Sequence, residues 1–364
     1  MRVAIDVQTI GRRRTGDETY YRGLISHYGS LRPDNEYFYY YTRSEAEPFL
    51  KGLGGISRPR RIRPSAAFLR IPLLYPWQML KERVDVFHTQ YVGIPFGGAK
   101  LVLTVHDLSF EHYPDTFRRD RAWLLKLTRW SANNASAVIT VSESTKRDLM
   151  NLYGIADRKI HVIYNAAGEE FVPCVDESRL ARLRESLGIR KNYFLFVGAF
   201  QPRKNLGRLL AAFHHARRRP NFDCQLVIVG AHAWGRSSVP AEGRDVVAPG
   251  YLDAGVLPAL YSGAMGLIYP SLYEGFGLPA VEAMSCGTPV IASSSSCLPE
   301  ICGQAAVYVD PFSEEDITRA MWAIHDHPQL RVKLREDGLR RARLFSWRES
   351  ARRTLEVYEK VNAS

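Results

Sequence analysis

Residues 270–289 read PSLYEGFGLPAVEAMSCGTP and follow a short apolar run, 266–269, that is typical of a buried strand. Gly275 and Gly277 predict a loop whose backbone a ligand can approach closely, because glycine carries no side chain. Pro279 predicts the start of a helix, since proline is tolerated in a first helical turn. A strand, a glycine loop and a helix in this order indicate a parallel α/β sheet with a ligand site at the carboxyl ends of its strands.

Two carboxylates flank the predicted helix start: Glu274 lies on the loop, and Glu282 is expected in the first helical turn. Free backbone N–H groups at a helix start attract phosphate, and acids in dinucleotide-binding folds accept hydrogen bonds from ribose. The arrangement therefore favours a ligand that carries both phosphate and hydroxyl groups. The alternative is a glycine-rich turn with two solvated acids, which fits a lone glutamate better than it fits this pair.

A second loop, 196–206, supplies cations. The strand before it ends at Gly198, Arg203 and Lys204 follow, and Asn205 is placed to cap the next helix. An arginine fork beside a lysine point charge suits a diphosphate. The alternative is an ordinary basic loop in a chain with 49 lysines and arginines.

Two features of the first half could also meet a ligand. His106 and Asp107 follow an apolar run, 101–105, so the histidine is expected at a strand's carboxyl end, where it can place a proton or hydrogen bond near a hydroxyl. Gly16 lies between the first predicted strand and helix, where backbone N–H groups can reach a phosphate. The alternatives are that His106 has only a structural role and that Gly16 lies in an ordinary turn.

Short apolar runs alternate with segments of helical period along the chain, which predicts an α/β fold. The pattern restarts after the turn-rich stretch 165–173, so we expect two Rossmann-like domains facing across a cleft. We place them at 1–168 and 169–345, with a C-terminal helix, 346–364, packing back toward the first domain. Strands are expected at 3–7, 37–41, 84–88, 101–105, 137–141, 161–164, 193–197, 225–229, 246–247, 266–269 and 289–292, and helices at 205–218, 257–262, 279–286 and 314–325.

Composition narrows the class of protein. The chain has 364 residues, of which 46% are hydrophobic, so it is expected to be globular with two domains. Five cysteines without a Cys-x-x-Cys pair favour a reducing cytosol over a disulfide scaffold or a zinc site. We find no signal peptide and no run of 18 apolar residues, so a cytoplasmic location is expected.

Several motifs are missing from the sequence. It contains no Gly-x-Gly-x-x-Gly, no Walker lysine pattern, no Asp-x-Asp and no His-Glu-x-x-His. These absences argue against a dinucleotide oxidoreductase, an ATPase and a metal site, so we expect no cofactor and no metal. The net charge of +11 favours an anionic partner, either nucleic acid, an anionic membrane surface or a phosphorylated substrate.

The segment 270–289, the loop Arg203–Asn205, the pair His106–Asp107 and the run Leu298–Glu300 followed by Gly303 together resemble glycosyltransferase family 4. That family consists of retaining enzymes with the GT-B fold of two Rossmann domains. The resemblance implies a hexosyltransferase of polysaccharide biosynthesis that moves a sugar from a nucleotide-sugar to a glycan or lipid-linked acceptor. It further implies metal-independent, same-face attack, and likeness to mannosyl-transferring relatives favours GDP-mannose.

The resemblance also implies residue roles. Glu282 would hold the donor ribose, and Glu274 would hold hydroxyls of the transferred sugar. His106, with Asp107 next to it, would lie beside the reaction centre. The implied diphosphate contacts are Arg203, Lys204, Gly16 and the backbone N–H groups near Phe276, Gly277 and Leu278. Residues 247–252 would flank the base, and the basic loop Arg12–Arg14 with Asp17–Glu18 departs from the family pattern.

Basic residues also lie beside aromatic ones in the first half. Five arginines at positions 58, 60, 61, 63 and 70 have no acid among them and adjoin an apolar stretch, 68–77, that two prolines interrupt. A second basic and aromatic stretch, 117–130, has helical spacing. Such patches suit an anionic bilayer, so we expect peripheral attachment to the inner face of the membrane. A soluble anionic acceptor is the alternative, and for 117–130 so is a solvated helix face.

Two other functions compete with the glycosyltransferase reading. An epimerase or phosphorylase of the same fold would need a hydrolytic acid or a cofactor lysine, and neither gives a signal. A nucleic-acid-binding protein would explain the charge of +11, but the sequence lacks a helix-turn-helix, a zinc finger and aromatic ribonucleoprotein motifs. We therefore expect no nucleic-acid partner.

Overall fold

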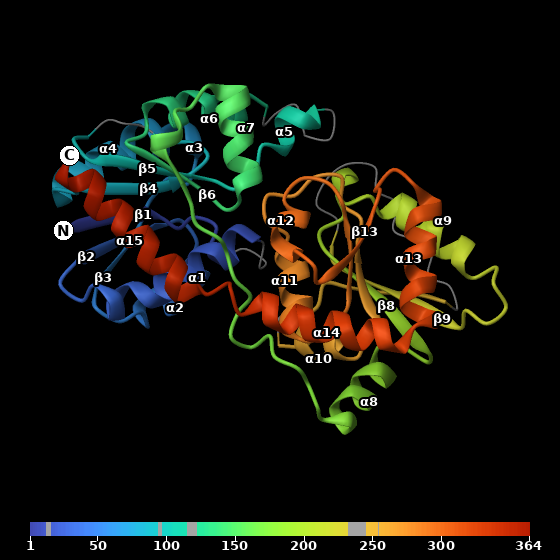
Figure 1. Ribbon diagram of the computed structural model, residues 1–364. Helices are drawn as coiled ribbons and strands as arrows, with labels where there is room; N and C mark the ends of the chain where they lie inside the picture. The colour runs from blue at the N-terminus through green and yellow to red at the C-terminus, as the bar shows by residue number, and fades with distance from the viewer. Residues whose placement is uncertain (12–15, 94–96, 115–121, 232–244, 254) are drawn as a thin grey trace. The chain divides into compact units, whose positions relative to one another are not determined.

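The computed structural model describes residues 1–11, 16–93, 97–114, 122–231, 245–253 and 255–364 (Figure 1). The chain divides into two compact units. Unit 1 consists of Met1–Leu108, Arg119–Asn165 and Ser346–Ser364, and unit 2 of Ser109–Arg118 and Ala166–Phe345. Each unit is built around its own parallel sheet.

The described part of unit 1 holds a seven-stranded sheet in the order β3-β2-β1-β4-β5-β6-β7, and every strand pair in it is parallel. Its strands are β1 (Arg2–Asp6), β2 (Glu36–Tyr41), β3 (Ile56–Arg61), β4 (Val86–Gln90), β5 (Lys100–Val105), β6 (Ala137–Thr140) and β7 (Ile160–Val162). The central strands are continuous runs of buried residues, because helices cover both faces of a parallel sheet.

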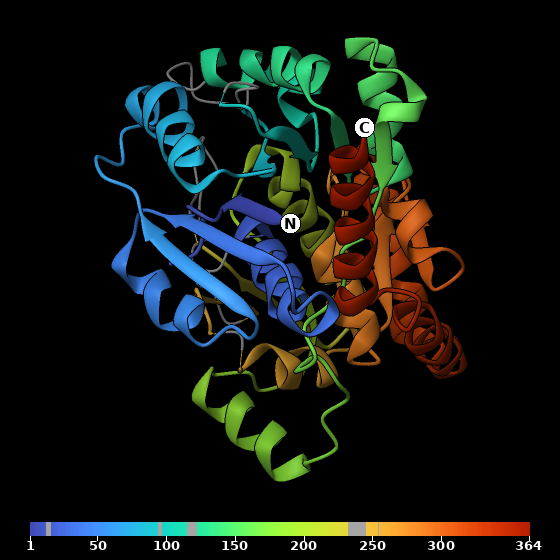
Figure 2. The same ribbon diagram turned by 90° about the vertical axis from the view of Figure 1, so that its left-hand side faces the viewer.

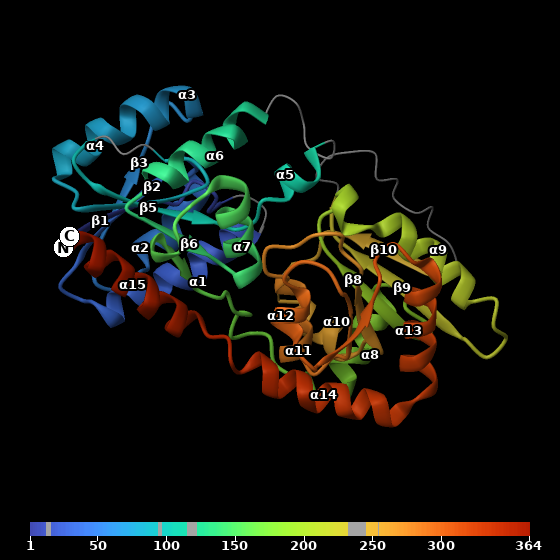
Figure 3. The ribbon, with the colours of Figure 1, turned by 45° about the horizontal axis from the view of Figure 1, so that its top comes forward.

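Helices cover the two faces of this sheet unequally. Figures 1 and 3 show α3 (Ala67–Leu69), α4 (Tyr75–Glu82) and α6 (Ala122–Asn134) over one face, with α1 (Gly16–Leu31), α2 (Glu47–Lys51) and α15 (Trp347–Ala363) over the other. A π-helical turn, η2 (Arg70–Leu74), joins α3 to α4, and α7 (Glu143–Tyr153) lies between β6 and β7 in the chain.

The C-terminal helix α15 is a structural part of unit 1, and it packs against α1. The approach is close: a Cβ atom on Gly23 of α1 would lie 2.2 Å from the Trp347 ring, so only glycine fits there. The Tyr358 hydroxyl lies 3.1 Å from the Tyr28 hydroxyl and 2.5 Å from Nδ1 of His88. Burial lowers the pKa of His88 to about 3, so this histidine is a neutral core residue.

Unit 2 contains a six-stranded sheet in the order β10-β9-β8-β11-β12-β13 among the residues described. The strands are β8 (Asn192–Val197), β9 (Cys224–Val229), β10 (Val246–Gly250), β11 (Gly266–Tyr269), β12 (Val290–Ser293) and β13 (Ala306–Val309). The helices are α5 (Ser109–His112), α8 (Glu177–Ser186), α9 (Leu206–Ala216), α10 (Leu257–Ser262), α11 (Leu278–Ser285), α12 (Leu298–Cys302), α13 (Glu314–Asp326) and α14 (Pro328–Ala342).

The core of unit 2 forms where α9 and α13 pack together over one face of the sheet, while α10 and α11 lie over the other (Figure 1). Phe194 and Phe196 from β8 meet Phe213 of α9 and Met321 of α13 there, and all four side chains are fully buried. This packing fixes the sheet whose strand ends carry the candidate site.

The α/β class with two Rossmann-like sheets is confirmed. Two strands, β3 and β13, were not predicted, and both lie at the edge of a sheet. An edge strand has one neighbour and stays partly exposed, so it needs no continuous apolar run. In β3, Pro59 and three arginines hide the strand pattern, and proline is tolerated at an edge because it lacks only one N–H donor.

Candidate functional site

Three charged side chains meet in unit 2. Glu274 Oε1 lies 2.6 Å from Lys204 Nζ, and Glu274 Oε2 lies 3.0 Å from Arg203 Nη1. The two cations sit in the turn Pro202–Lys204 that follows β8, and Glu274 sits in the loop that follows β11. Strands β8 and β11 are neighbours and parallel, so their carboxyl ends bring the two loops together.

Further hydrogen bonds hold this cluster in place. Lys204 Nζ also lies 2.6 Å from the Tyr269 hydroxyl, at the end of β11. Arg203 donates to the backbone carbonyl of Tyr273 at 2.9 Å, and the backbone N–H of Glu274 donates to Ser296 Oγ at 3.0 Å. Side chains so fixed need little reorganisation when a ligand arrives.

The cluster holds Glu274 between two cations. Burial alone would raise the pKa of Glu274, but the charges of Lys204 and Arg203 and the hydrogen bond from Lys204 lower it to about 2. Glu274 is therefore ionised at neutral pH. Two cations thus adjoin one carboxylate at the carboxyl end of the sheet.

The start of α11 supplies backbone donors beside this cluster in sequence. Gly277 adopts the left-handed conformation with φ of +87°, and a Cβ there would lie 2.7 Å from Leu298, so glycine is required. Within the described residues, the backbone N–H groups of Gly277 and Leu278 have no acceptor. Phe276 is buried, and its ring packs edge-on against Phe345 at 5.5 Å.

Glu282 is the fifth residue of α11 and begins its second turn, one residue further along the helix than predicted, because the helix already begins at Leu278. Its Oε2 accepts a hydrogen bond of 2.9 Å from the Tyr261 hydroxyl. Burial raises the pKa of Glu282 to about 7; the Tyr261 hydrogen bond opposes this shift, and the charge of Glu170 adds to it. Near neutral pH this carboxyl is thus divided between its ionised and protonated forms.

The predicted capping role of Asn205 is wrong. Asn205 precedes α9 in the left-handed conformation, but its side chain makes no cap hydrogen bond. Its Nδ2 instead donates to the backbone carbonyls of Pro270 at 3.0 Å and Pro311 at 2.6 Å. Asn205 therefore ties the Arg203–Lys204 turn to the loops that follow β11 and β13.

His106 follows β5 in unit 1, as predicted, and is buried. Burial lowers its pKa, against the charges of Asp17 and Asp107, which raise it. Its Nε2 has no hydrogen-bond partner among the described residues and lies 4.0 Å from the carboxylate of Asp17. The ring packs edge-on against Tyr20 at 4.7 Å, which fixes its orientation.

Gly16 is the exposed first residue of α1, and the basic residues Arg12–Arg14 lie outside the described residues. The sequence analysis noted Asp17 and Glu18 only as a departure from the family. Asp17 faces His106, and Glu18 is buried and pairs with Arg22 at 2.8 Å. Tyr261 and Tyr269, which contact Glu282 and Lys204, gave no sequence signal because the contacts join distant segments.

The arginines at positions 58–70 do not form the acid-free cluster that the sequence predicted. Arg58 pairs with Glu36 at 3.1 Å and Arg60 with Glu82 at 2.5 Å, so acids from other strands and helices compensate both. Arg70 is buried and donates to the Ser65 carbonyl at 2.6 Å and to the Gln8 side chain. Arg61 and Arg63 stay exposed.

An exposed apolar face lies along α3, η2 and α4. Phe68, Leu73, Trp77 and Leu80 are 67%, 60%, 60% and 62% exposed, which is unusual for large apolar side chains so close together. In the second predicted patch, part of 117–130 lies outside the described residues, and Leu127 and Trp130 of α6 are also exposed. Among the described residues, no helix has the length and apolarity to cross a membrane, and no group of three or more His, Cys, Asp or Glu could hold a metal ion.

Comparison with known proteins identifies similar sequences in both halves. Residues 181–341 match the family described as glycosyl transferases group 1, and residues 18–170 match glycosyltransferase family 4. The chain is 28% identical to O-antigen chain mannosyltransferase B of Escherichia coli, over 79% of this chain and 78% of that protein. It is 32% identical to O-antigen chain mannosyltransferase RfbU of Salmonella typhimurium, over 65% of this chain and 68% of that protein.

Solved structures show the same architecture. The Anabaena protein HepE in complex with UDP-glucose superposes with a TM-score of 0.79 at 18% identity, covering 99% of this chain and all of that one. Sucrose-phosphate synthase of Thermosynechococcus elongatus gives a TM-score of 0.77 at 21% identity, over 100% of this chain and 99% of that one. These likenesses establish the GT-B fold for the chain.

Proposed function

The chain belongs to glycosyltransferase family 4 and is a GT-B glycosyltransferase, and on this basis we propose that it moves a mannosyl group from GDP-mannose to a glycan or lipid-linked acceptor. Relatives named as O-antigen mannosyltransferases support the choice of sugar and a place in polysaccharide biosynthesis. Unit 2 binds the donor in this proposal, and unit 1 binds the acceptor.

The observation that carries the proposal is the Arg203–Lys204–Glu274 cluster, which brings two buried cations to the carboxyl ends of β8 and β11. A nucleotide-sugar bears a diphosphate, and this group gains negative charge as the bond to the sugar breaks. The two cations and the N–H groups of Gly277 and Leu278 stabilise that charge without a metal ion. Glu274, held ionised between the cations, also offers its oxygens to hydroxyls of the transferred sugar.

Glu282 accepts hydrogen bonds from the donor ribose in this proposal. The residue is partly exposed, and Tyr261 fixes one of its carboxyl oxygens. Residues 247–252, which include the end of β10, flank the base. In unit 1, Gly16 approaches the diphosphate, and neutral His106 with Asp107 lies beside the reacting sugar.

We propose a retaining, same-face reaction. The bond between the anomeric carbon and the diphosphate oxygen breaks, and the acceptor oxygen bonds to the same face of that carbon. The acceptor proton passes to the leaving diphosphate oxygen. No carboxylate nucleophile is needed, and Glu274 is unsuited to that role because both of its oxygens already bond to cations.

A donor screen tests the proposal. The protein is mixed with GDP-mannose, UDP-sugars and dTDP-sugars in buffer with EDTA, and thermal stability and sugar release are followed. Stabilisation and turnover with GDP-mannose alone, in the presence of EDTA, support the proposed donor and the metal-independent reaction. Turnover with another nucleotide-sugar corrects the donor, loss of activity in EDTA removes metal independence, and stabilisation by duplex DNA alone rejects the function.

Replacing Glu282 by alanine is expected to weaken donor binding about tenfold to a hundredfold, because a charge-assisted hydrogen bond contributes about 1.5–3 kcal/mol. Since the pKa of Glu282 is about 7, donor affinity of the wild type should also rise as pH increases from 6 to 8 and the carboxylate forms. Glu282→Gln should abolish this rise. Isothermal titration calorimetry measures both effects, and unchanged affinity in Glu282→Ala would exclude the residue from the donor site.

We further propose that unit 1 attaches peripherally to the inner face of an anionic membrane through the exposed face of α3, η2 and α4. Phe68, Leu73, Trp77 and Leu80 supply apolar surface, and aromatic residues favour the bilayer interface. Exposed Lys81 of α4 adds positive charge beside this surface, with its Nζ 5.3 Å from the centre of the Trp77 ring. An amphipathic face of this kind lies on the membrane without crossing it.

Replacing Leu73 and Trp77 together by serine is expected to reduce binding to phosphatidylglycerol vesicles by at least about tenfold, because burying each side chain contributes about 1.5–3 kcal/mol. The matched control replaces Val332 and Leu344, which are equally exposed but lie in unit 2. Vesicle co-sedimentation at rising salt measures the effect. Equal loss in both variants, or no binding by the wild type at low salt, would contradict membrane attachment.

A further inference from the structure

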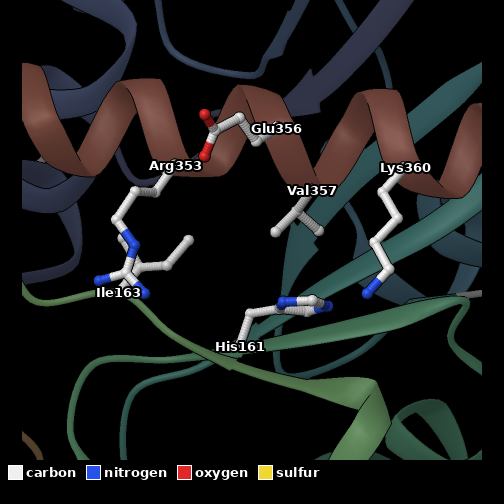
Figure 4. A pocket seen from close by; sticks show the side chains of 6 residues that line it. All are labelled: His161, Ile163, Arg353, Glu356, Val357 and Lys360. Atoms are coloured by element: carbon white, nitrogen blue, oxygen red, sulfur yellow. The ribbon is translucent and has the colours of Figure 1, made fainter.

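A pocket of about 250 Å³ lies in unit 1 between the C-terminal helix α15 and the edge strand β7 (Figure 4). It uses none of the residues assigned above to the donor, the acceptor or the membrane. Figure 2 shows α15 running beside the green segment of the chain that contains β7. The lining residues are His161, Ile163, Arg353, Glu356, Val357 and Lys360.

The two cations of the pocket come from one face of α15. Arg353 and Lys360 are seven residues apart, which places their backbones about 10 Å apart along the helix with Val357 between them. In Figure 4 both side chains extend from α15 toward the strand, with the guanidinium of Arg353 beside Ile163 and the ammonium of Lys360 beside the His161 ring. The side chains of His161, Arg353 and Lys360 therefore line the same pocket.

The two cations of the pocket have no ion-pair partner among the described residues, although one acid, Glu356, also lines it. Within the described part of the chain, no acid forms a salt bridge with Arg353 or Lys360. Glu356 of α15 pairs with Arg352, which also pairs with Glu349, so Arg352 and not Arg353 or Lys360 is the ion-pair partner of Glu356.

The positive charges of the pocket also act on His161. Burial lowers its pKa, and the charges of Lys360, Arg353 and Lys146 lower it further. Lys146 belongs to α7 and pairs with Asp157 at 2.6 Å, so positive groups approach His161 from two helices. At neutral pH the ring is neutral, and an arriving anion would favour its protonation.

The size of the pocket limits the ligand. Sites for drug-sized ligands occupy about 300–1,000 Å³, so a space of about 250 Å³ is too small for a whole nucleotide-sugar. An arginine fork binds two oxygens of a phosphate, and a lysine adds a point charge to a neighbouring oxygen. The apolar side chains of Ile163 and Val357 limit the access of water between them.

We propose that this pocket of α15 and β7 binds a phosphate group, as inorganic phosphate or diphosphate or as the phosphate of a small molecule or lipid headgroup. Arg353 and Lys360 hold the phosphate oxygens from one side, and His161 donates a hydrogen bond from the other. Binding clamps α15 against the sheet edge. It also favours protonation of His161, so the affinity that is lost as the phosphate itself takes up a proton between pH 8 and pH 6 should be partly restored.

Calorimetric titration of the full chain with inorganic phosphate and diphosphate tests this site. The titration is repeated in an Arg203→Gln, Lys204→Gln background: binding that this background loses is assigned to the proposed donor site, and binding that it keeps is assigned to the pocket, whether or not the donor proposal holds. Arg353→Gln with Lys360→Gln should weaken binding about tenfold to a hundredfold. Arg348→Gln, an exposed arginine of the same helix outside the pocket, should leave it unchanged.

Two further arms complete the test. His161→Gln should bind at pH 8 like the parent protein but lose more affinity than the parent between pH 8 and pH 6. Vesicles with phosphatidylglycerol separate the sources of phosphate: binding of vesicles but not of diphosphate, sensitive to Arg353 and Lys360, assigns the pocket to a lipid headgroup. No binding of either probe, or binding that the double variant leaves unchanged, overturns the proposal.

Discussion

Replacing Lys204 by alanine is expected to lower kcat about a hundredfold to a thousandfold, the loss typical when a preorganised donor to a developing negative charge is removed. KM should change less, because the charge on the diphosphate grows in the transition state and is smaller in the bound donor. Steady-state kinetics with the nucleotide-sugar found in the donor screen measures both constants.

The control for this variant is Lys333→Ala, because Lys333 is exposed and pairs with Asp337 at 3.3 Å in the same unit. Lys204→Ala also leaves Glu274 with one cation, so thermal unfolding must show that the variant is folded. Lys204→Arg keeps the charge and should retain more activity than the alanine variant. A folded Lys204→Ala protein with the kcat of the wild type would contradict a role for Lys204 in leaving-group stabilisation.

Acid should destabilise unit 2 through Glu274. Its pKa is about 2 in the folded protein and 4.5 ordinarily, a difference that corresponds to about 3 kcal/mol of stability at pH 7. Since the folded pKa is the lower one, this contribution is present above pH 4.5 and is lost as pH falls toward 2. The free energy of unfolding should therefore fall more steeply in the wild type than in Glu274→Gln.

Urea denaturation between pH 7 and pH 2 measures this difference. The stability gap between the wild type and Glu274→Gln should be largest at neutral pH and close as pH approaches 2. Glu315→Gln removes a carboxylate whose side chain is 79% exposed, and it should change the pH profile little. Parallel profiles for the wild type and Glu274→Gln would show that the ion cluster does not stabilise the fold.

The sequence predicted the strand–loop–helix around Glu274 and the Arg203–Lys204 turn because both patterns are local. Apolar strands, glycines and a proline mark them within a few residues. It did not predict that the two loops meet, because the contact joins positions 70 residues apart and depends on β8 and β11 being neighbours. For the same reason, Asn205 was assigned to its own helix and not to Pro270 and Pro311.

Strand β3 illustrates a different limit. Its arginines form an acid-free run in the sequence, but Glu36 and Glu82 lie next to Arg58 and Arg60 in space. Charge patterns along a chain therefore overstate the charge of a surface when neighbouring elements are not yet known. Burial of Arg70 against Gln8 removes a further residue from the predicted basic patch. The exposed apolar face along α3, η2 and α4 is the clearer indication of a membrane-binding surface.

The chain leaves unit 1 at Asn165 and returns to it at Ser346, so α15 is the last part of unit 1 to be synthesised. On the ribosome, the segment that forms most of unit 2 emerges before the helix that covers α1 and Tyr28. Unit 2 can thus complete its sheet during translation. Until α15 is made, Gly23 lacks its contact with Trp347 and His88 lacks its contact with Tyr358. Chaperone dependence and premature termination should therefore affect the first-made unit more than the second.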